Sequence, residues 1–219
     1  MAQEDPVDAP VCTAGERAAD ALVHALGLTA GLAGASWLLS AALTAHAPAV
    51  ERLSLAAYGA GLVGMLAASA AYHLSRPGRL KEMLRRIDHA MIFVMIAGSY
   101  TPFTLNRLAG GTGVALCTTV WTVALGGVGL KLAFPRRFER LGFALYLALG
   151  WAILSVAGPL LESMAPATLL LLGAGGIIYT VGAVIHTREN LPYHTALWHA
   201  LVVAAASCHF AAVAREFVA

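Results

Sequence analysis

Seven long apolar stretches occupy most of this 219-residue chain, and each is about long enough to cross a lipid bilayer as a helix. They span roughly 22–45, 53–74, 89–106, 112–132, 141–161, 167–186 and 196–215. The stretches are continuous and rich in Ala, Leu and Gly, without the apolar–polar alternation that is typical of membrane β-barrels. The sequence therefore predicts an all-α integral membrane protein, folded as a seven-transmembrane-helix bundle.

Charge is scarce along the whole chain. Only 12% of the residues are charged and 59% are hydrophobic, whereas a soluble domain carries about 25% charged residues. This composition excludes an ordinary soluble globule and a disordered protein. The net charge of +2, without a long basic run interleaved with aromatic residues, argues against nucleic acid as a partner. The three scattered cysteines form no CxxC pair, which argues against a disulfide framework and a cysteine-bound zinc site.

Residues 1–17 differ from the rest of the chain because they are acidic and contain Pro6 and Pro10. They are predicted to form a disordered N-terminal tail, followed by one seven-helix transmembrane domain over residues 18–219. The tail lacks the basic region of a signal peptide, so we expect the first span to remain in the mature protein.

The placement of Lys and Arg predicts how the bundle is oriented. Eleven of these residues fall on one side of the predicted bundle and three on the other. The larger set is Arg17, Arg76, Arg79, Lys81, Arg85, Arg86, Lys131, Arg136, Arg137, Arg140 and Arg188, and the smaller set is Arg52, Arg107 and Arg215. Because cytoplasmic loops carry the excess of basic residues, we expect a cytoplasmic N-terminus and an external C-terminus.

Six of the eight histidines fall near the face that this orientation makes cytoplasmic. They are His24, His73, His89, His186, His194 and His199, and Asp88 lies at the same depth. His209 is deeper in its span, and His46 lies at the outer end of the first span. A single histidine at the interface is more often explained by hydrogen bonds to headgroups and water. Ionisable groups inside spans mark functional sites, however, and the set of His73, Asp88, His194 and His199 is the candidate site.

Imidazole groups suit zinc, and a catalytic zinc site uses three protein ligands and leaves one position for water. His73 ends the second span, while His194 and His199 begin the seventh, so the three could supply these ligands. Ser69 precedes His73 by four residues and faces the same way, whereas Tyr72 points elsewhere.

Two carboxylates lie near these histidines in the predicted bundle. Asp88 could orient the metal-bound water or take its proton. Asp20 lies four residues before His24 and could hold that histidine from outside the metal's own ligands. The alternative is that Asp20 and His24 are simply an acid at a helix start and an interfacial histidine.

Four sequence motifs now carry a family resemblance. They are GERAADALVHALGL (15–28), SAAYHL (69–74), RRIDHAMIFVMIAGSYTPF (85–103) and PYHTALWHALVVAAASCHF (192–210). Together they resemble the hemolysin III family of bacterial membrane proteins, which belongs with the progestin and adipoQ receptors and is related to alkaline ceramidases. The resemblance implies a multi-pass protein of the inner (plasma) membrane with its N-terminus inside.

The resemblance also implies a zinc ion near the cytoplasmic face. In the adiponectin-receptor relatives one histidine of the second helix and two of the seventh bind the metal, and an aspartate of the third contacts its water. By motif His73 resembles the first ligand, His199 one of the second pair, and Asp88 the water partner. Ser69 matches the serine of the S-x-x-x-H motif.

One position departs from that pattern. His194 precedes His199 by five residues instead of four, which on a regular helix turns the two side chains about 140° apart. Both could face one metal only if the backbone is irregular, and Pro192 suggests that the helix starts nearby. If His194 is not the third ligand, then His89, His24 or a carboxylate could complete the site.

The resemblance implies a zinc-dependent hydrolase that cleaves an amide or ester bond of a membrane lipid entering between the helices. Ceramide-like amides are the substrates suggested by the relatives, and another acyl lipid is the alternative. Two other functions stay open. The family name suggests a cytolysin or pore-former, and a closed structural zinc site would suit a non-enzymatic regulator of membrane lipid state or energetics.

Overall fold

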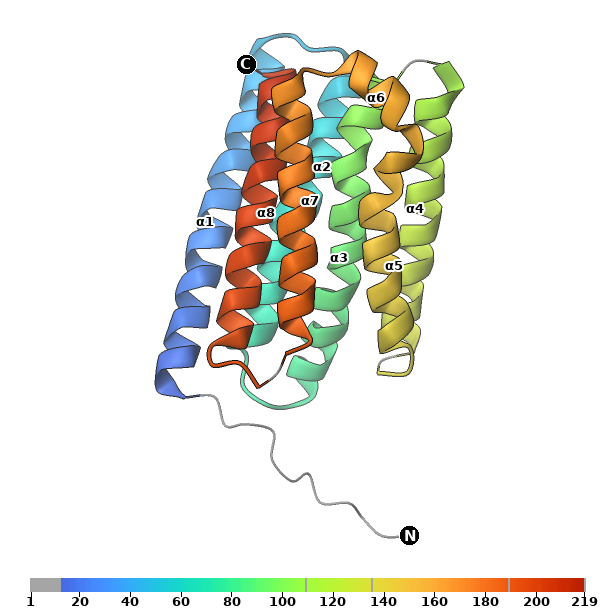
Figure 1. Cartoon of the computed structure of the whole chain (residues 1–219). Helices are drawn as coiled ribbons and strands as arrows, with labels where there is room; N and C mark the ends of the chain where they lie inside the picture. The colour runs from blue at the N-terminus through green and yellow to red at the C-terminus, as the bar shows by residue number, and fades with distance from the viewer. Residues whose placement is uncertain (1–12, 109, 135, 189, 219) are drawn as a thin grey trace.

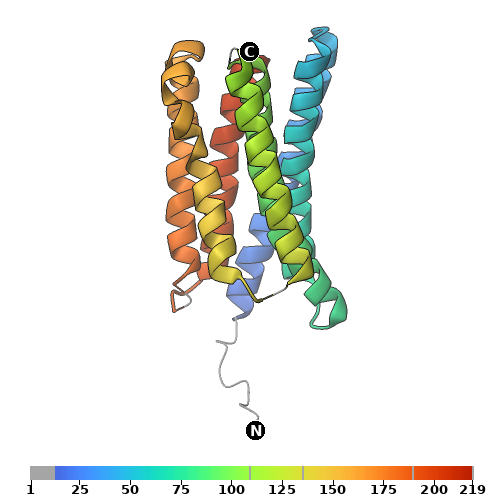
Figure 2. The same ribbon diagram turned by 90° about the vertical axis from the view of Figure 1, so that its right-hand side faces the viewer.

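The computed structural model describes residues 13–108, 110–134, 136–188 and 190–218, and every regular element in these segments is a helix. The elements are α1 (Ala14–Thr44), α2 (Ala49–Leu74), α3 (Arg79–Asn106), α4 (Gly110–Ala133), α5 (Glu139–Trp151), the 3-10 helix η1 (Ala152–Val156), α6 (Ala157–Ser163), α7 (Pro166–His186) and α8 (His194–Phe217). The long helices lie side by side with their axes roughly aligned, as Figure 1 and, after a quarter turn, Figure 2 show. The predicted all-α bundle is thus confirmed.

Six helices of the described chain are long and apolar enough to cross a membrane. They are α1, α2, α4, α7, α8 and the continuous run Glu139–Ser163. The predicted span at 89–106 forms the second part of α3, whose first part is rich in charged residues. As a result α3 is long, at 28 residues, but less apolar than the other six.

The first helix begins earlier than predicted. Thr13 and Glu16 form a capping box, in which the Thr13 hydroxyl accepts a hydrogen bond from Glu16 N at 3.1 Å and the Glu16 carboxylate accepts one from Thr13 N at 2.7 Å. The assignment of residues 14–17 to a disordered tail is therefore wrong, because they form the first turn of α1. Residues 1–12 of that predicted tail lie outside the described residues. The early start places Asp20 and His24 well inside α1.

The helix order brings distant parts of the chain together. Neighbouring helices pack as the pairs α1–α2, α2–α3, α3–α4 and α7–α8, and α8 also packs against α1. The first helix is thereby held between α2 and α8. All three have one end at the lower edge of the bundle in Figure 1, where α1 and α8 begin and α2 ends.

The span that starts at Glu139 is not a uniform helix. Its backbone changes to a 3-10 helix at Ala152, and Tyr100 of α3 contacts this break. The Tyr100 hydroxyl donates to Leu149 O at 2.7 Å and accepts a hydrogen bond from Ile153 N at 2.8 Å. Backbone groups freed inside a membrane need such partners because no water reaches them there.

The upper end of the bundle is joined by charged groups. Arg107, the residue that caps the end of α3, donates from Nε to Glu216 Oε1 at 2.7 Å and from Nη2 to the Glu216 carbonyl oxygen at 2.6 Å. Thr168 of α7 donates to the second carboxylate oxygen of Glu216 at 2.9 Å. One carboxylate of α8 therefore links α3 and α7.

Gly127 of α4 allows close packing against Phe93 of α3, whose ring is fully buried. A methyl group at this glycine would overlap three atoms of that ring. We expect Gly127→Ala to lower the thermal unfolding temperature in detergent, because overpacking a filled core destabilises by about 1–3 kcal/mol. Gly126→Ala, one residue earlier, is the matched control, since nothing lies within 4 Å of its added carbon. Equal effects of the two substitutions would contradict this account of the packing.

Candidate metal centre

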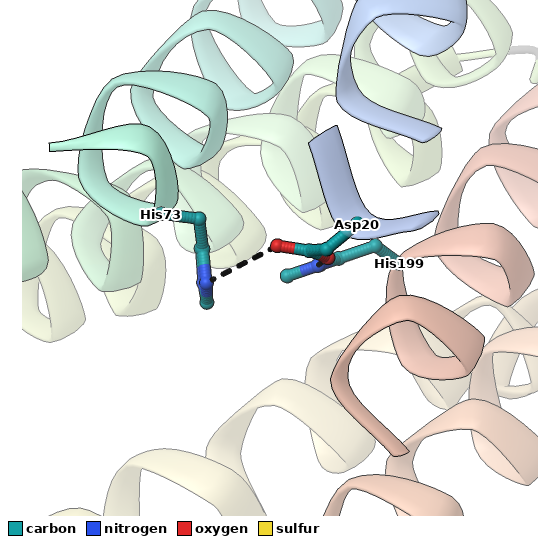
Figure 3. A group of neighbouring side chains, drawn as sticks. All are labelled: Asp20, His73 and His199. Carbon is teal, nitrogen blue, oxygen red and sulfur yellow. Dashed lines mark hydrogen bonds and ion pairs between the residues drawn. The ribbon is translucent and has the colours of Figure 1, made fainter. Parts of the chain in front are cut away.

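Three side chains from three helices meet at the lower end of the bundle. Asp20 of α1, His73 of α2 and His199 of α8 have potential ligand atoms that all lie within 4.8 Å of one another. His199 donates from Nδ1 to Asp20 Oδ1 at 2.6 Å, and His73 Nδ1 lies 3.8 Å from Asp20 Oδ2 (Figure 3). The carboxylate of Asp20 therefore lies between the two imidazoles, each of which approaches a different oxygen.

Burial sets this group apart from ordinary interfacial histidines. His199 is 7% exposed and lies beside the equally buried His24. The rings of His73 and His199 pack edge to face with centroids 4.3 Å apart. Such close imidazoles, next to a carboxylate and largely buried, with His73 the most exposed at 23%, form a compact set of metal donor atoms.

His24 belongs to the same cluster but has a different role. Its Nδ1 donates to the backbone carbonyl of Asp20 at 2.8 Å, and its Nε2 lies 3.2 Å from Ser69 Oγ. Both ring nitrogens are thus engaged by protein atoms. The Asp20 carboxylate lies farther away, at 3.7 Å from Nδ1. The predicted contact between the two side chains is present, but the carboxylate is directed mainly at His199.

Ser69 connects this cluster to Asp88. The serine lies on α2 one turn before His73, and its hydroxyl contacts His24 of α1. Asp88 of α3 is 7% exposed and lies close enough to Ser69 and His199 to interact with both. The structure therefore brings Ser69, His73, Asp88 and His199 together with Asp20 and His24 of α1, which the sequence analysis placed in the surroundings of the site.

His194 is not among the three residues whose donor atoms converge. It is the first residue of α8, after Tyr193 in a left-handed backbone conformation with φ 57°. Its Nε2 lies 3.3 Å from the hydroxyl of Thr195, the next residue. From His194 onward α8 is a regular helix, so the angular separation from His199 expected for a five-residue spacing holds here.

The other candidate residues lie around the centre or away from it. Tyr72 packs its ring against His73, with centroids 4.6 Å apart. His89 is directed toward α5, where its Nδ1 lies 3.8 Å from Glu139 Oε2. Arg85 and Lys131 also pair with the Glu139 carboxylate. His209 lies deeper, with Nε2 3.3 Å from Leu172 O of α7. The structure therefore does not bring His89 or His209 into the candidate metal centre.

Asp20 is the member whose position sequence reasoning placed only at the edge. Its spacing from His24 indicated a local contact, whereas the structure adds contacts across 179 positions of sequence to His199. The signal available in the sequence was an acidic residue at the depth of the histidines. The sequence did not show that α1 packs between α2 and α8, which brings Asp20 to His73 and His199.

Comparison with known proteins supports the resemblance seen in the sequence. The family described as "Haemolysin-III related" matches residues 16–210, a range that contains every residue of the candidate centre. The "Hemolysin-3 homolog" of Bacillus subtilis (strain 168) is 33% identical over 195 residues, covering 89% of this chain and 91% of the relative. "Hemolysin-3" of Bacillus cereus is 32% identical over 195 residues, covering 89% of each.

A more distant similarity extends to animals. The "Monocyte to macrophage differentiation factor" of Homo sapiens is 26% identical over 171 residues, covering 74% of this chain and 70% of that protein. The family match and the two bacterial relatives each cover most of the chain. With six apolar helices among its described residues, the chain is therefore a multi-pass membrane protein that belongs to the haemolysin-III-related family.

Proposed function

We propose that this protein is a zinc-dependent hydrolase of membrane lipids, with the metal bound by Asp20, His73 and His199. The observation that carries the proposal is the convergence of these donors from α1, α2 and α8 in a largely buried site. Two imidazoles and a carboxylate are a ligand set of catalytic zinc sites, which keep a fourth position open. When bound, zinc would supply a Lewis acid that activates water for attack on a carbonyl group.

The donor atoms need only a modest rearrangement to fit a metal. Zinc–nitrogen and zinc–oxygen bonds of about 2.0–2.2 Å bring ligand atoms to roughly 3.5 Å from one another. His199 Nδ1 and Asp20 Oδ1 are closer than this because they share a hydrogen bond. The His73 Nδ1–Asp20 Oδ2 pair, at 3.8 Å, is already near the required spacing. Metal binding would replace the shared proton, which is the usual coupling of metal affinity to pH.

Asp88 is the proposed proton acceptor of the reaction. It lies buried on α3 beside His199 and Ser69, on a helix that contributes no metal donor. A carboxylate within reach of the reacting water, but outside the ligand set, can take its proton and pass it to the leaving group. Ser69 and His24 hold the surroundings in place by joining α1 and α2 next to Asp88.

The proposed substrate is an acyl lipid with an amide or ester bond, entering between the helices from the surrounding membrane. The outward faces of the bundle carry large apolar side chains such as Leu22, Leu26 and Leu74, which suit lipid acyl chains as neighbours. Membrane lipids would then both surround the helices and supply the substrate. A ceramide-like amide is the first substrate to test.

We further propose that α3 also crosses the membrane, which raises the number of spans from six to seven. We place the protein in the inner membrane of a bacterial cell, with the candidate centre at the cytoplasmic side. In support, α3 is 28 residues long and packs between α2 and α4, parallel to the other long helices. The described chain begins at one end of the bundle and finishes at the other, which suits an odd number of spans. Most basic residues flank the end that holds the candidate centre.

The names of the two bacterial relatives favour membrane lysis as a second candidate. Lysis by a pore would not need the buried donors of Asp20, His73 and His199. The two functions therefore respond differently to substitutions at the centre, which would abolish hydrolysis and leave a pore unaffected.

The metal site is tested by elemental analysis of purified wild-type protein and its variants. We expect about one zinc per chain in the wild type, and loss of the metal in His73→Ala and His199→Ala, since each removes a ligand. His46→Ala is the control, because His46 lies at the opposite end of α1. A wild type that takes up no metal after zinc addition would refute the site.

The third ligand is tested by comparing Asp20→Ala with His194→Ala. We expect the Asp20 variant to lose zinc and the His194 variant to keep it, because only Asp20 lies with the two other donors. Zinc affinity, measured by competition with a chelator, is the readout. The reverse outcome would make His194 the ligand, in a first turn of α8 rearranged from the one described above.

The role of Asp88 is tested with Asp88→Asn, which keeps the shape of the side chain and removes its basicity. We expect zinc to stay bound while hydrolysis of acyl lipids falls by about 10²–10⁴-fold, the usual contribution of a general base. The assay compares wild type and variant on a panel of ceramides and glycerolipids. Unchanged activity of the variant would instead point to a structural or regulatory role of the metal.

The number of spans is tested by reporters fused to each terminus in a bacterial host. Seven spans place the termini on opposite sides of the membrane, whereas six place them on the same side. We expect an N-terminal fluorescent protein to be cytoplasmic and a C-terminal alkaline phosphatase fusion to be active outside. An inactive C-terminal phosphatase, together with a fluorescent C-terminal fusion, would contradict a total of seven spans.

A further inference from the structure

The start of α8 is joined to the start of α1 by a carboxylate that lies outside the candidate metal centre. Tyr193, the residue before α8, donates from its backbone nitrogen to Glu16 Oε1 at 2.9 Å. The other oxygen, Glu16 Oε2, accepts a hydrogen bond from Thr13 N at 2.7 Å in the capping box of α1. Each oxygen of this carboxylate therefore serves a different helix.

Tyr193 has a backbone conformation that needs such a partner. Its φ of 57° and ψ of 19° are left-handed, which is uncommon for residues other than glycine. The side chain of Tyr193 also reaches the first turn of α1, where a methyl group at Gly15 would lie 2.8 Å from its hydroxyl oxygen. Both the backbone and the side chain of Tyr193 are thus placed against α1.

Two polar contacts at different heights join α1 to α8. Glu16 precedes Asp20 by one helical turn, roughly 6 Å, and Tyr193 precedes His199 by roughly 9 Å. The two helices begin at the same end of the bundle (Figure 1). The Glu16–Tyr193 and Asp20–His199 hydrogen bonds therefore set how far α8 is shifted along α1 and how it is rotated, which one bond alone would not do.

We propose that Glu16 is a positioning residue of the metal centre, which holds the start of α8 so that His199 faces Asp20. The inference rests on the proposed zinc site and adds a residue that is outside its ligand set. Metal ligands must be held within about 0.5 Å of their productive positions. Loss of a group that orients a ligand typically lowers metal affinity by about 10–100-fold. Because the Asp20–His199 bond remains, we expect the lower end of this range.

The test compares Glu16→Ala with Thr13→Ala in the full-length protein in detergent. Glu16→Ala removes the acceptor of the Tyr193 amide, whereas Thr13→Ala weakens the cap of α1 and leaves that acceptor in place. We expect zinc affinity, measured by competition with a chelator, to fall about tenfold in Glu16→Ala and to stay near the wild-type value in Thr13→Ala. In metal-free protein, amide hydrogen exchange of the peptide containing Tyr193 should be faster only in Glu16→Ala.

The substitution Tyr193→Gly separates positioning from a general loss of stability. Glycine adopts the left-handed conformation without support, so Glu16→Ala should lower zinc affinity less in this background. Equal losses in the two backgrounds, or an unchanged affinity of Glu16→Ala, would overturn the proposal and leave the zinc site intact. If Glu16→Ala does not fold, Glu16→Gln replaces it, and a smaller loss is expected because one amide oxygen must serve two donors; unchanged zinc affinity would again overturn the proposal.

A wild type that binds no zinc would refute the site and this role of Glu16 with it. The hydrogen-exchange comparison does not depend on metal, and it reports separately whether Glu16 holds the start of α8. Failure of the zinc site and failure of the Glu16 contact are therefore distinguished.

Discussion

The carboxylate of Asp20 is the contact on which the lower half of the bundle depends. It accepts a hydrogen bond from His199 of α8 and lies 3.8 Å from His73 of α2. The backbone carbonyl of Asp20 accepts a hydrogen bond from His24. An ionisable group within a membrane helix is unfavourable unless it is paired or solvated. Because the partners of Asp20 lie on α2 and α8, its carboxylate is paired only while α1 lies between those two helices. The side chains that could bind a metal are thus the same ones that fix the position of the first helix.

Polar contacts define both ends of the bundle, and small residues define its middle. At the upper end Glu216 joins α3, α7 and α8. Between the ends, Gly27 and Gly31 let α1 approach Val203 of α8 and Leu66 of α2. In lipid the helices gain little from hiding apolar surface, so close packing at small residues and a few polar links must hold them together. This division leaves the outward faces mainly to large apolar side chains such as Leu125 and Leu170.

The sequence predicted the helices and most of the candidate centre for one physical reason. Apolar runs of span length and histidines at a common depth are visible without knowledge of helix neighbours, so His73, Asp88 and His199 could be grouped from depth alone. Depth does not show which way a side chain points, and for this reason His89 was grouped with residues that it does not contact. The direction of His89 toward Glu139 depends on how α3 packs against α5.

Other features lay beyond the reach of sequence patterns. The Thr13–Glu16 spacing of a capping box signals the early start of α1. This polar signal lies before the apolar run, so the apolar run alone predicts a later start. The change of helix type at Ala152 has no comparable signal, because its partner is a tyrosine 53 residues away from Ile153 in sequence.

That tyrosine bears on how the protein is assembled in the membrane. At the break between α5 and α6, the Leu149 carbonyl accepts a hydrogen bond from the Tyr100 hydroxyl of α3 and the Ile153 amide donates one to it, and α3 precedes both residues in the chain. A segment entering the bilayer with unsatisfied backbone groups would be held back, whereas one that enters beside its partner is not. Since synthesis proceeds from the N-terminus, α3 is already made when this segment emerges. The irregular span can therefore pair with Tyr100 as soon as it enters the membrane. The order of the helices along the chain is thus compatible with insertion in the same order.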